Sequence, residues 1–237
     1  SVGFHHTVSE LGKFVDDYFA SDRGKSQVAV PFVLDKDGLI YFLFDPKFYA
    51  WHLASGDGGA KDKSSIGSEV VNEGYLNNLG KTWFDGKYVY RGVPVKLPKP
   101  WRQQQYFASY TIEQVLGLIH LTFWIFNNFK DIPRKYLDSF DYSWNYVSFL
   151  GCFNHCNVNA GKTDMSPAFP VKWLKLAIEM YEEFEKEKSR HIELEPVQPA
   201  PIYRKTPVGS IVLESAYVDK FNIPAATGLA GVKKLEE

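Results

Sequence analysis

The sequence predicts an α/β or α+β domain over about residues 1 to 190, because segments of helical and of strand periodicity alternate along it. Its 237 residues suit one large domain or one domain with an appendage, and 45% of them are apolar, which allows a sizeable buried core. Prolines recur between residues 196 and 207 and interrupt any helix there. We therefore expect residues 191–237 to be a C-terminal tail or a small accessory segment.

Three segments show helical spacing. Residues 7–20 place apolar side chains on one face and begin with a capping box. Residues 111–129 contain the most apolar run of the chain, but this run is shorter than the about 20 residues that a membrane span needs, so we expect a buried helix and no membrane insertion. Residues 171–189 are amphipathic, with five side chains predicted to face inward: Leu174, Ala177, Ile178, Tyr181 and Phe184.

Strand signals lie between these helices. Residues 28–34 and 39–44 are rich in apolar side chains on either side of an Asp-Lys-Asp-Gly turn, which predicts a β-hairpin. Residues 65–72 alternate, so that Glu69 shares one strand face with the neighbours two positions away. Residues 146–153 have the composition of a further strand.

The segment from about residue 73 to residue 110 is polar and punctuated by Gly and Pro, and it is unusually aromatic. Between Tyr75 and Tyr110 there are nine aromatic residues in 36. We expect an insertion with short strands, such as residues 88–95, placed between the strand that carries Glu69 and the buried helix.

Composition excludes several classes of protein. The 27 Lys and Arg residues are balanced by 28 Asp and Glu residues, so no broad basic field is available for a nucleic-acid partner. Cys152 and Cys156 are too few for a disulfide framework, and we expect both to be buried free thiols. No signal-peptide pattern is visible at the start of the sequence.

Three features indicate chemistry when they are taken together. His5 closes a short strand, His155 and Asp164 lie nine residues apart across a Gly-containing loop, and Glu69 is the one carboxylate of its strand. Two imidazoles and one carboxylate form a familiar zinc site with a fourth position open for water. If the loop is extended, Lys162 and Asp164 point to the same side, so the Lys162 ammonium would lie beside the metal and can stabilise an oxyanion. Glu69 can transfer protons. The alternative for the His5-His6 pair is a capping or merely packed role.

Five short motifs follow one another between residues 4 and 170. They are Phe4-His5-His6-Thr7, the apolar hairpin Pro31 to Ile40, Ala50-Trp51-His52, Ser65-Ile66-Gly67-Ser68-Glu69, and the block from His155 through Lys162-Thr163-Asp164 to Pro167-Ala168-Phe169-Pro170. In this order they resemble the type-2 N-acetylmuramoyl-L-alanine amidases, whose zinc fold is shared with peptidoglycan recognition proteins, short phage amidases and anhydro-muropeptide amidases. The resemblance covers about residues 4 to 176.

This resemblance implies a central mixed β-sheet flanked by helices and one Zn²⁺ ion on His5, His155 and Asp164, with Lys162 and Glu69 catalytic. Further residues are expected to contact the substrate: Trp51, His52, Thr163 and, in the insertion, Trp83 and Trp101, whose rings can pack against sugar and stem-peptide surfaces. For His52, a structural role beside Trp51 is left open as an alternative. His6 is expected to point away from the metal. Val30 stands where one branch of the family has a Tyr, and Asp164-Met165-Ser166 replaces the usual Asp-Pro-Gly.

The implied activity is hydrolysis of the lactyl-L-alanine amide of peptidoglycan by a phage or bacterial cell-wall lytic enzyme, such as an endolysin. The expected partners are peptidoglycan and muropeptides; no oligomeric state is predicted. The expected location is the host cytoplasm until release to the wall, or the periplasm or exterior if a leader was trimmed. The alternatives are a non-catalytic peptidoglycan-binding module and a component of a phage particle or secretion machine.

Overall fold

The computed structural model describes residues 1–9, 28–77, 79–83, 86 and 88–190. The helix expected over residues 7–20 and the tail expected over residues 191–237 lie outside the described residues, apart from the first three positions of that helix.

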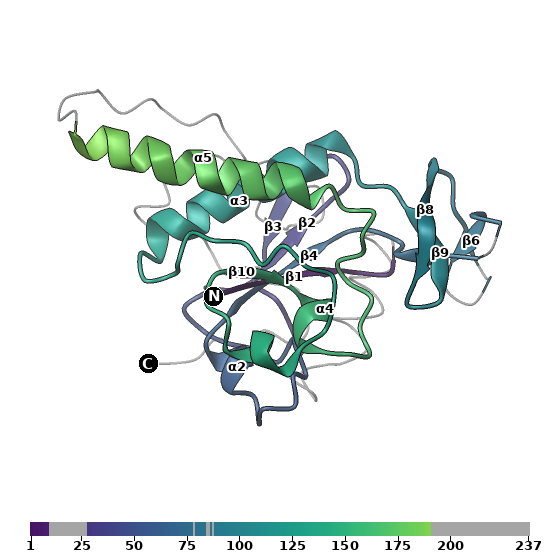
Figure 1. Cartoon of the computed structure of the whole chain (residues 1–237), viewed down its shortest axis with the longest axis horizontal. Helices are drawn as coiled ribbons and strands as arrows, with labels where there is room; N and C mark the ends of the chain where they lie inside the picture. Colours follow the sequence, from purple (N-terminus) through teal and green to yellow (C-terminus); the bar gives the residue numbers. More distant parts are fainter. Residues whose placement is uncertain (10–27, 78, 84–85, 87, 191–237) are drawn as a thin grey trace.

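A five-stranded mixed sheet forms the centre of the domain (Figure 1). Its order is β10 (Cys152–Asn154), β1 (Val2–His6), β4 (Ile66–Val70), β2 (Phe32–Leu34) and β3 (Ile40–Phe42). The first four strands are parallel to their neighbours, and β3 pairs antiparallel with β2 as the predicted hairpin. The prediction of a central mixed sheet flanked by helices is confirmed.

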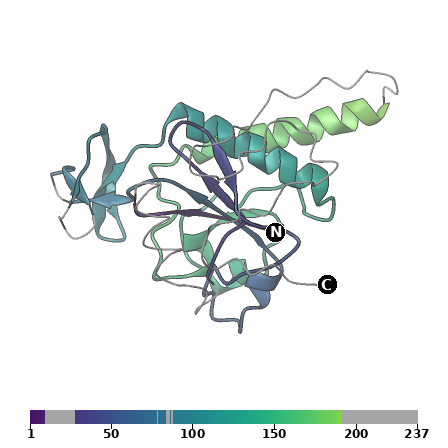
Figure 2. The ribbon, with the colours of Figure 1, turned by 180° about the vertical axis from the view of Figure 1, so that it is seen from behind.

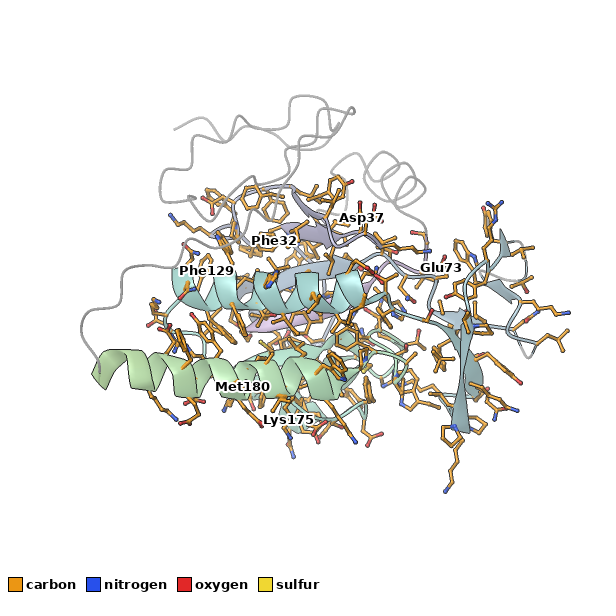
Figure 3. All side chains as sticks on the ribbon, turned by 90° about the horizontal axis from the view of Figure 1, so that it is seen from above. Phe32, Asp37, Glu73, Phe129, Lys175 and Met180 are labelled. Atoms are coloured by element: carbon orange, nitrogen blue, oxygen red, sulfur yellow. The ribbon has the colours of Figure 1, made fainter. Side chains whose placement is uncertain are left out.

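Two long helices, α3 (Ile112–Asn128) and α5 (Val171–Arg190), run side by side over one face of this sheet, as Figures 1 and 3 show from two directions. Strand residues with even numbers, such as Phe4 and Val70, point into the core beneath α3 and α5. Each fully buried Phe or Leu side chain in such a core contributes about 1.5–3 kcal/mol. The odd-numbered strand residues therefore point to the opposite face, which lies below the sheet in Figure 1 and, seen from behind, in Figure 2.

Helix α3 is the predicted buried helix. Thr111 caps it by accepting a hydrogen bond from the Gln114 N–H, and the Gln114 side chain accepts one from the Thr111 N–H. A Cβ on Gly117 would lie 2.7 Å from Leu34 Cδ1, so this glycine lets the helix approach the hairpin closely. None of the helices in the described parts of the chain is long and apolar enough to cross a membrane.

Three of the sequence expectations are wrong in detail. The single strand expected over residues 88–95 is instead two strands, Tyr88–Val89 and Pro94–Trp101. Most of residues 146–153 is not a strand, because residues Trp144–Ser148 form a 3₁₀ helix, η2, capped by Ser143, and only β10 is extended. The backbone of this segment is hydrogen-bonded locally, because the Phe149 N–H donates to the Tyr146 carbonyl at 3.0 Å. The rings of both residues pack beside β10 rather than within the sheet.

Phe184 was predicted to face inward from α5, and it is 59% exposed. Phe184 follows Leu174 by ten residues, which places the two side chains about 80° apart around the axis of an α-helix. Leu174 is on the buried side. Trp173, Leu176 and Met180 are exposed on the same side of α5, and Figure 3 shows Met180 pointing away from α3.

The insertion forms two small sheets at one end of the domain (Figure 1). The first has the order β5 (Tyr75–Leu76), β9 (Gln104–Ala108) and β8 (Pro94–Trp101). The second pairs β6 (Thr82–Trp83) with β7 (Tyr88–Val89). Two short helices, α2 (Ala60–Lys63) and α4 (His155–Val158), lie on the face of the sheet opposite α3 and α5.

Candidate metal centre

The predicted ligands meet where parallel strands end, the edge at which α/β sheets most often bind ligands. His5 lies near the end of β1, and His155 directly follows β10 as the first residue of α4. Asp164 returns to the same place at the end of the loop that follows α4. All three residues are buried, with 2% to 7% of their surfaces exposed.

The facing atoms of these three side chains lie within hydrogen-bond distance of one another. His5 Nδ1 is 2.9 Å from His155 Nδ1, and Asp164 Oδ2 is 2.9 Å from His155 Nδ1 and 3.3 Å from His5 Nδ1. The structure therefore brings together the predicted set of His5, His155 and Asp164.

The hydrogen bond made by His155 Nε2 determines the role of Nδ1 in the same ring. His155 Nε2 lies 2.7 Å from the carbonyl oxygen of Leu53, which can only accept a hydrogen bond. Nε2 must therefore carry the ring proton. In the neutral ring, Nδ1 then presents a lone pair to the cluster.

A chain of hydrogen bonds determines which ring nitrogen of His5 carries the proton. The Ser65 hydroxyl donates to the Lys61 carbonyl at 2.7 Å, so it accepts from His52 Nε2 at 3.0 Å. Burial, helped by the neighbouring imidazoles, holds the pKa of His52 well below its usual value, so this ring is neutral and its Nδ1 accepts. His5 Nε2, at 2.8 Å, must donate to it. Burial also lowers the pKa of His5 to about 4, which leaves a lone pair on its Nδ1.

Three electron-pair donors therefore converge on one point. Burial alone would raise the pKa of Asp164, but the charge and hydrogen bonds of the His155 and His5 rings, in the metal-free state in which a proton is shared within the cluster, hold the pKa of this carboxyl well below its usual range, so it is ionised. One proton can join only two of the three atoms, whereas one divalent cation can be bound by all of them. Two imidazole nitrogens and one carboxylate oxygen are ligands that Zn²⁺ prefers, and the residues present fit this ion.

Glu69 lies beside this cluster. It is paired in register with His5 on the adjacent strand, so both side chains point to the same face of the sheet. The Glu69 side chain is 7% exposed, and its Oε2 has no hydrogen-bond partner in the part of the chain that the structure describes. Burial, together with the charge of Asp164 and against that of Lys162, raises the pKa of Glu69 well above its usual value. A carboxyl whose pKa is raised in this way is suited to accept a proton and then to release it.

Lys162 is exposed on the loop between α4 and Asp164, close enough for its charge to influence Glu69 and His5. The loop is tied by Asn159, whose side chain donates to the carbonyls of Leu53 and Ala54 at 3.1 and 2.9 Å. Thr163 is half-buried between Lys162 and the cluster residue Asp164.

The remaining predicted site residues lie in different surroundings. Both ring nitrogens of His52 are engaged with His5 and Ser65, which favours the structural alternative for this residue. Trp51 is half-buried, with the Tyr49 ring edge-on at 5.9 Å. Its contact with the substrate stays a prediction.

Trp83 is 3% exposed and stacks on Tyr88 with 4.8 Å between ring centroids, so its faces are packed within the insertion rather than open to a sugar. Trp101 is half-buried and packs against Phe107 and Phe140. A substrate contact of Trp101 also stays a prediction.

The other sequence expectations near the site agree with the structure. His6 points away from the cluster, and its Nδ1 lies 2.8 Å from the Tyr110 hydroxyl. Cys152 and Cys156 are buried free thiols. Sequence reasoning missed Ser65 and the Leu53 carbonyl, which fix the ring protons of the predicted ligands His5 and His155. The place of Ser65 at the head of the Ser-Ile-Gly motif was its only signal.

Comparison with known proteins gave matches among solved structures. No model of a protein family matches the chain, and no curated protein matches it in sequence. The chain is similar to the N-acetylmuramyl-L-alanine amidase AmiD from E. coli, solved with an anhydro-N-acetylmuramic acid peptide, at 17% identity and a TM-score of 0.48. The match covers 74% of this chain and 56% of that one, so the chain spans little more than half of the AmiD structure.

Two further matches are AmpDh3 from Pseudomonas aeruginosa and the amidase LysC from Clostridium intestinale URNW. AmpDh3 matches at 16% identity and a TM-score of 0.48, over 82% of this chain and 68% of that one. LysC matches at 18% identity and a TM-score of 0.43, over 75% and 83%. The solved structures that this chain is similar to thus include N-acetylmuramoyl-L-alanine amidases.

Proposed function

We propose that the protein is a zinc-dependent N-acetylmuramoyl-L-alanine amidase that hydrolyses the amide between the lactyl group and L-alanine in peptidoglycan. The observation that carries the proposal is the convergence of three lone-pair donors, on His5, His155 and Asp164, beside the buried carboxyl group of Glu69. The order of the five sequence motifs supports the choice of substrate.

Each residue has a chemical task in this proposal. His5, His155 and Asp164 would hold the ion, and bound zinc would supply a Lewis acid that polarises a carbonyl. Glu69 takes a proton from the attacking water and passes it to the nitrogen of the leaving amine as the C–N bond breaks, and its raised pKa suits both transfers. The Lys162 ammonium stabilises the negative charge that develops on the amide oxygen.

The setting and extent of the enzyme are part of the same proposal. Residues 1–190 would form the catalytic domain, with residues 191–237 appended, in a phage or bacterial enzyme that acts at the cell wall. Trp51, Thr163 and Trp101 would contact the muropeptide. Deletion of residues 191–237 should leave hydrolysis of soluble muropeptides intact.

The test is the appearance of new L-alanine amino termini when the purified full chain digests peptidoglycan. Chelation should abolish the release and added Zn²⁺ should restore it. Glu69→Gln and Lys162→Met should each lower the rate by about 10²- to 10⁴-fold without loss of the fold. Their matched controls are Glu113→Gln and Lys172→Met, which change an exposed acid on α3 and an exposed lysine on α5.

Release by both site variants at the parent rate would contradict the assigned roles. Tight binding of muropeptides by the zinc-loaded chain, with no release of amino termini, would instead identify a peptidoglycan-binding module.

A further inference from the structure

The β8–β9 hairpin of the insertion reaches the loop that joins His155 to Asp164. Arg102, at the hairpin tip, donates from Nη2 to the Cys156 carbonyl at 3.0 Å and from Nη1 to the Ala160 carbonyl at 2.8 Å. Its Nη1 also donates to the Lys162 carbonyl. One guanidinium therefore binds three backbone carbonyls of the segment that carries two of the proposed ligands and Lys162.

We propose that Arg102 is a positioning residue that fixes the loop between His155 and Asp164, and that the insertion thereby becomes a structural part of the site. The relevance to catalysis rests on the proposed function. The hold of the guanidinium on the loop does not, because it is a property of the chain without metal or substrate.

The Cys156 carbonyl that Arg102 binds has no donor within its own helix. Helix α4 is only four residues long, and the last four carbonyls of an α-helix have no intrahelical partner. The planar guanidinium offers five N–H donors in a fixed arrangement and can bind several carbonyls at once, which a lysine ammonium on a flexible stem does less well.

The conformation of the hairpin turn directs Arg102 toward the loop. Trp101 pairs with Gln104 across the strands, and the two residues between them have positive φ angles of 48° for Arg102 and 67° for Gln103. This two-residue turn favours asparagine and glycine at both positions. A turn that local preference disfavours persists when the surrounding contacts determine it, and the three bonds of the guanidinium are such contacts.

An aromatic ring also packs against the guanidinium. Its central carbon lies 4.9 Å from the centre of the Trp101 ring, which also contacts Phe140 at 6.3 Å between centroids. The segment that contains Phe140 is bound to α4, because the Asn157 side chain donates to the carbonyls of Ser139 and Asp141 at 2.9 and 3.0 Å. The hairpin, this segment and the loop therefore form one contiguous support.

Hydrogen–deuterium exchange of the zinc-free full chain tests the proposal directly. Amides of the loop that are protected in the structure include those of Cys156, Asn159 and Lys162, which donate to backbone carbonyls within the same segment. In Arg102→Ala, peptides covering residues 155–166 should exchange at least about tenfold faster than in the parent. Lys99→Ala, which removes an exposed cation of the same hairpin, should leave loop exchange unchanged.

Arg102→Lys keeps the charge and the length of the side chain, so it separates the role of the guanidinium from hairpin stability. We expect it to give intermediate loop exchange while peptides of residues 94–108 exchange as in the parent. The zinc dissociation constant should rise about tenfold in Arg102→Ala, and kcat should fall with KM nearly unchanged.

Unchanged loop exchange in Arg102→Ala would overturn the proposal. Equal acceleration of loop and hairpin peptides in both Arg102 variants would also overturn it, because the hairpin as a whole would then hold the loop. Neither result depends on zinc binding or turnover, so failure of the proposed amidase function would be recognised separately.

Discussion

Replacing Ser65 by Ala should weaken zinc binding, although Ser65 is not a ligand. Its hydroxyl accepts the Nε2 proton of His52, and His52 Nδ1 in turn accepts the Nε2 proton of His5. Without the hydroxyl, the His52 proton has no partner at Nε2 and can move to Nδ1, where it would confront the N–H of His5. His5 would then be driven to place its own proton on Nδ1, the atom that faces His155 and Asp164.

Loss of a group that orients a metal ligand typically costs 10- to 100-fold in metal affinity. The expected change for Ser65→Ala is therefore a rise of the zinc dissociation constant by about 10- to 100-fold, or about 1.4–2.8 kcal/mol. Competition with a chromogenic chelator measures this constant on the full chain. Thermal unfolding of the zinc-free variant reports whether the fold is kept.

Ser64→Ala is the matched control for this experiment. The Ser64 hydroxyl donates to the same Lys61 carbonyl, at 3.2 Å, but it is the neighbouring Ser65 that accepts the hydrogen bond from His52. We expect the Ser64 variant to bind zinc within about twofold of the parent. Parent-like affinity in Ser65→Ala, or an equal loss in both variants, would refute the proton assignment on which the metal site is built.

Three further predictions concern the stability of the zinc-free protein and, in the last of them, zinc binding as well. Burial lowers the pKa of His6 to about 4, so the unfolded chain takes up this proton near pH 6.5 and the folded chain only near pH 4. In urea unfolding, the stability contributed by neutral His6 should be complete above pH 6.5 and should fall toward pH 4. The fall should be shallower in His6→Gln than in the exposed control His120→Gln. Burial raises the pKa of Glu69, so the contribution of this carboxyl to stability is complete below about pH 4.5 and is lost as the pH rises through the pKa of the folded state. The melting temperature of Glu69→Gln should therefore rise relative to that of the parent from pH 5 to pH 8. A difference that stays constant over this range would contradict the prediction. A Cβ on Gly67 would lie 2.9 Å from His52 Nδ1, so Gly67→Ala should lower the free energy of unfolding by about 1–3 kcal/mol and weaken zinc binding. Parent-like values for both quantities would show that the His52 ring is free to shift.

Local patterns predicted much of the fold and the composition of the site. The β2–β3 hairpin, α3 and the full length of α5 follow from short-range periodicity, turn residues and capping, which depend on neighbours in the sequence. The cluster of His5, His155 and Asp164 followed from residue types and motif order. Residues 146–153 were misjudged because aromatic and β-branched side chains favour strands only where a partner strand is present.

The support of the site could not be predicted, because it consists of contacts between distant segments. The bonds from Arg102 to the loop span more than 50 residues of sequence, and they depend on where the β8–β9 turn falls and on the positive φ angles within it. The bond between His52 and His5 depends on Gly67, which leaves room for the imidazole against the sheet. Neither arrangement leaves a periodic signal in the sequence.

The packing of the helix-side core also determines the chemistry on the other face. Phe4 and Val70 are fully buried beneath α3 and α5, and strand alternation then obliges His5 and Glu69 to point the opposite way, side by side in register. A slip of β4 by one residue would turn Glu69 into the apolar core and Val70 toward the metal ligands, at the cost of an unpaired buried carboxyl. The distance between the proposed ligand His5 and the proposed proton-transfer group Glu69 is therefore set by the same apolar contacts that stabilise the sheet, so a chain that folds correctly also assembles this part of the proposed site.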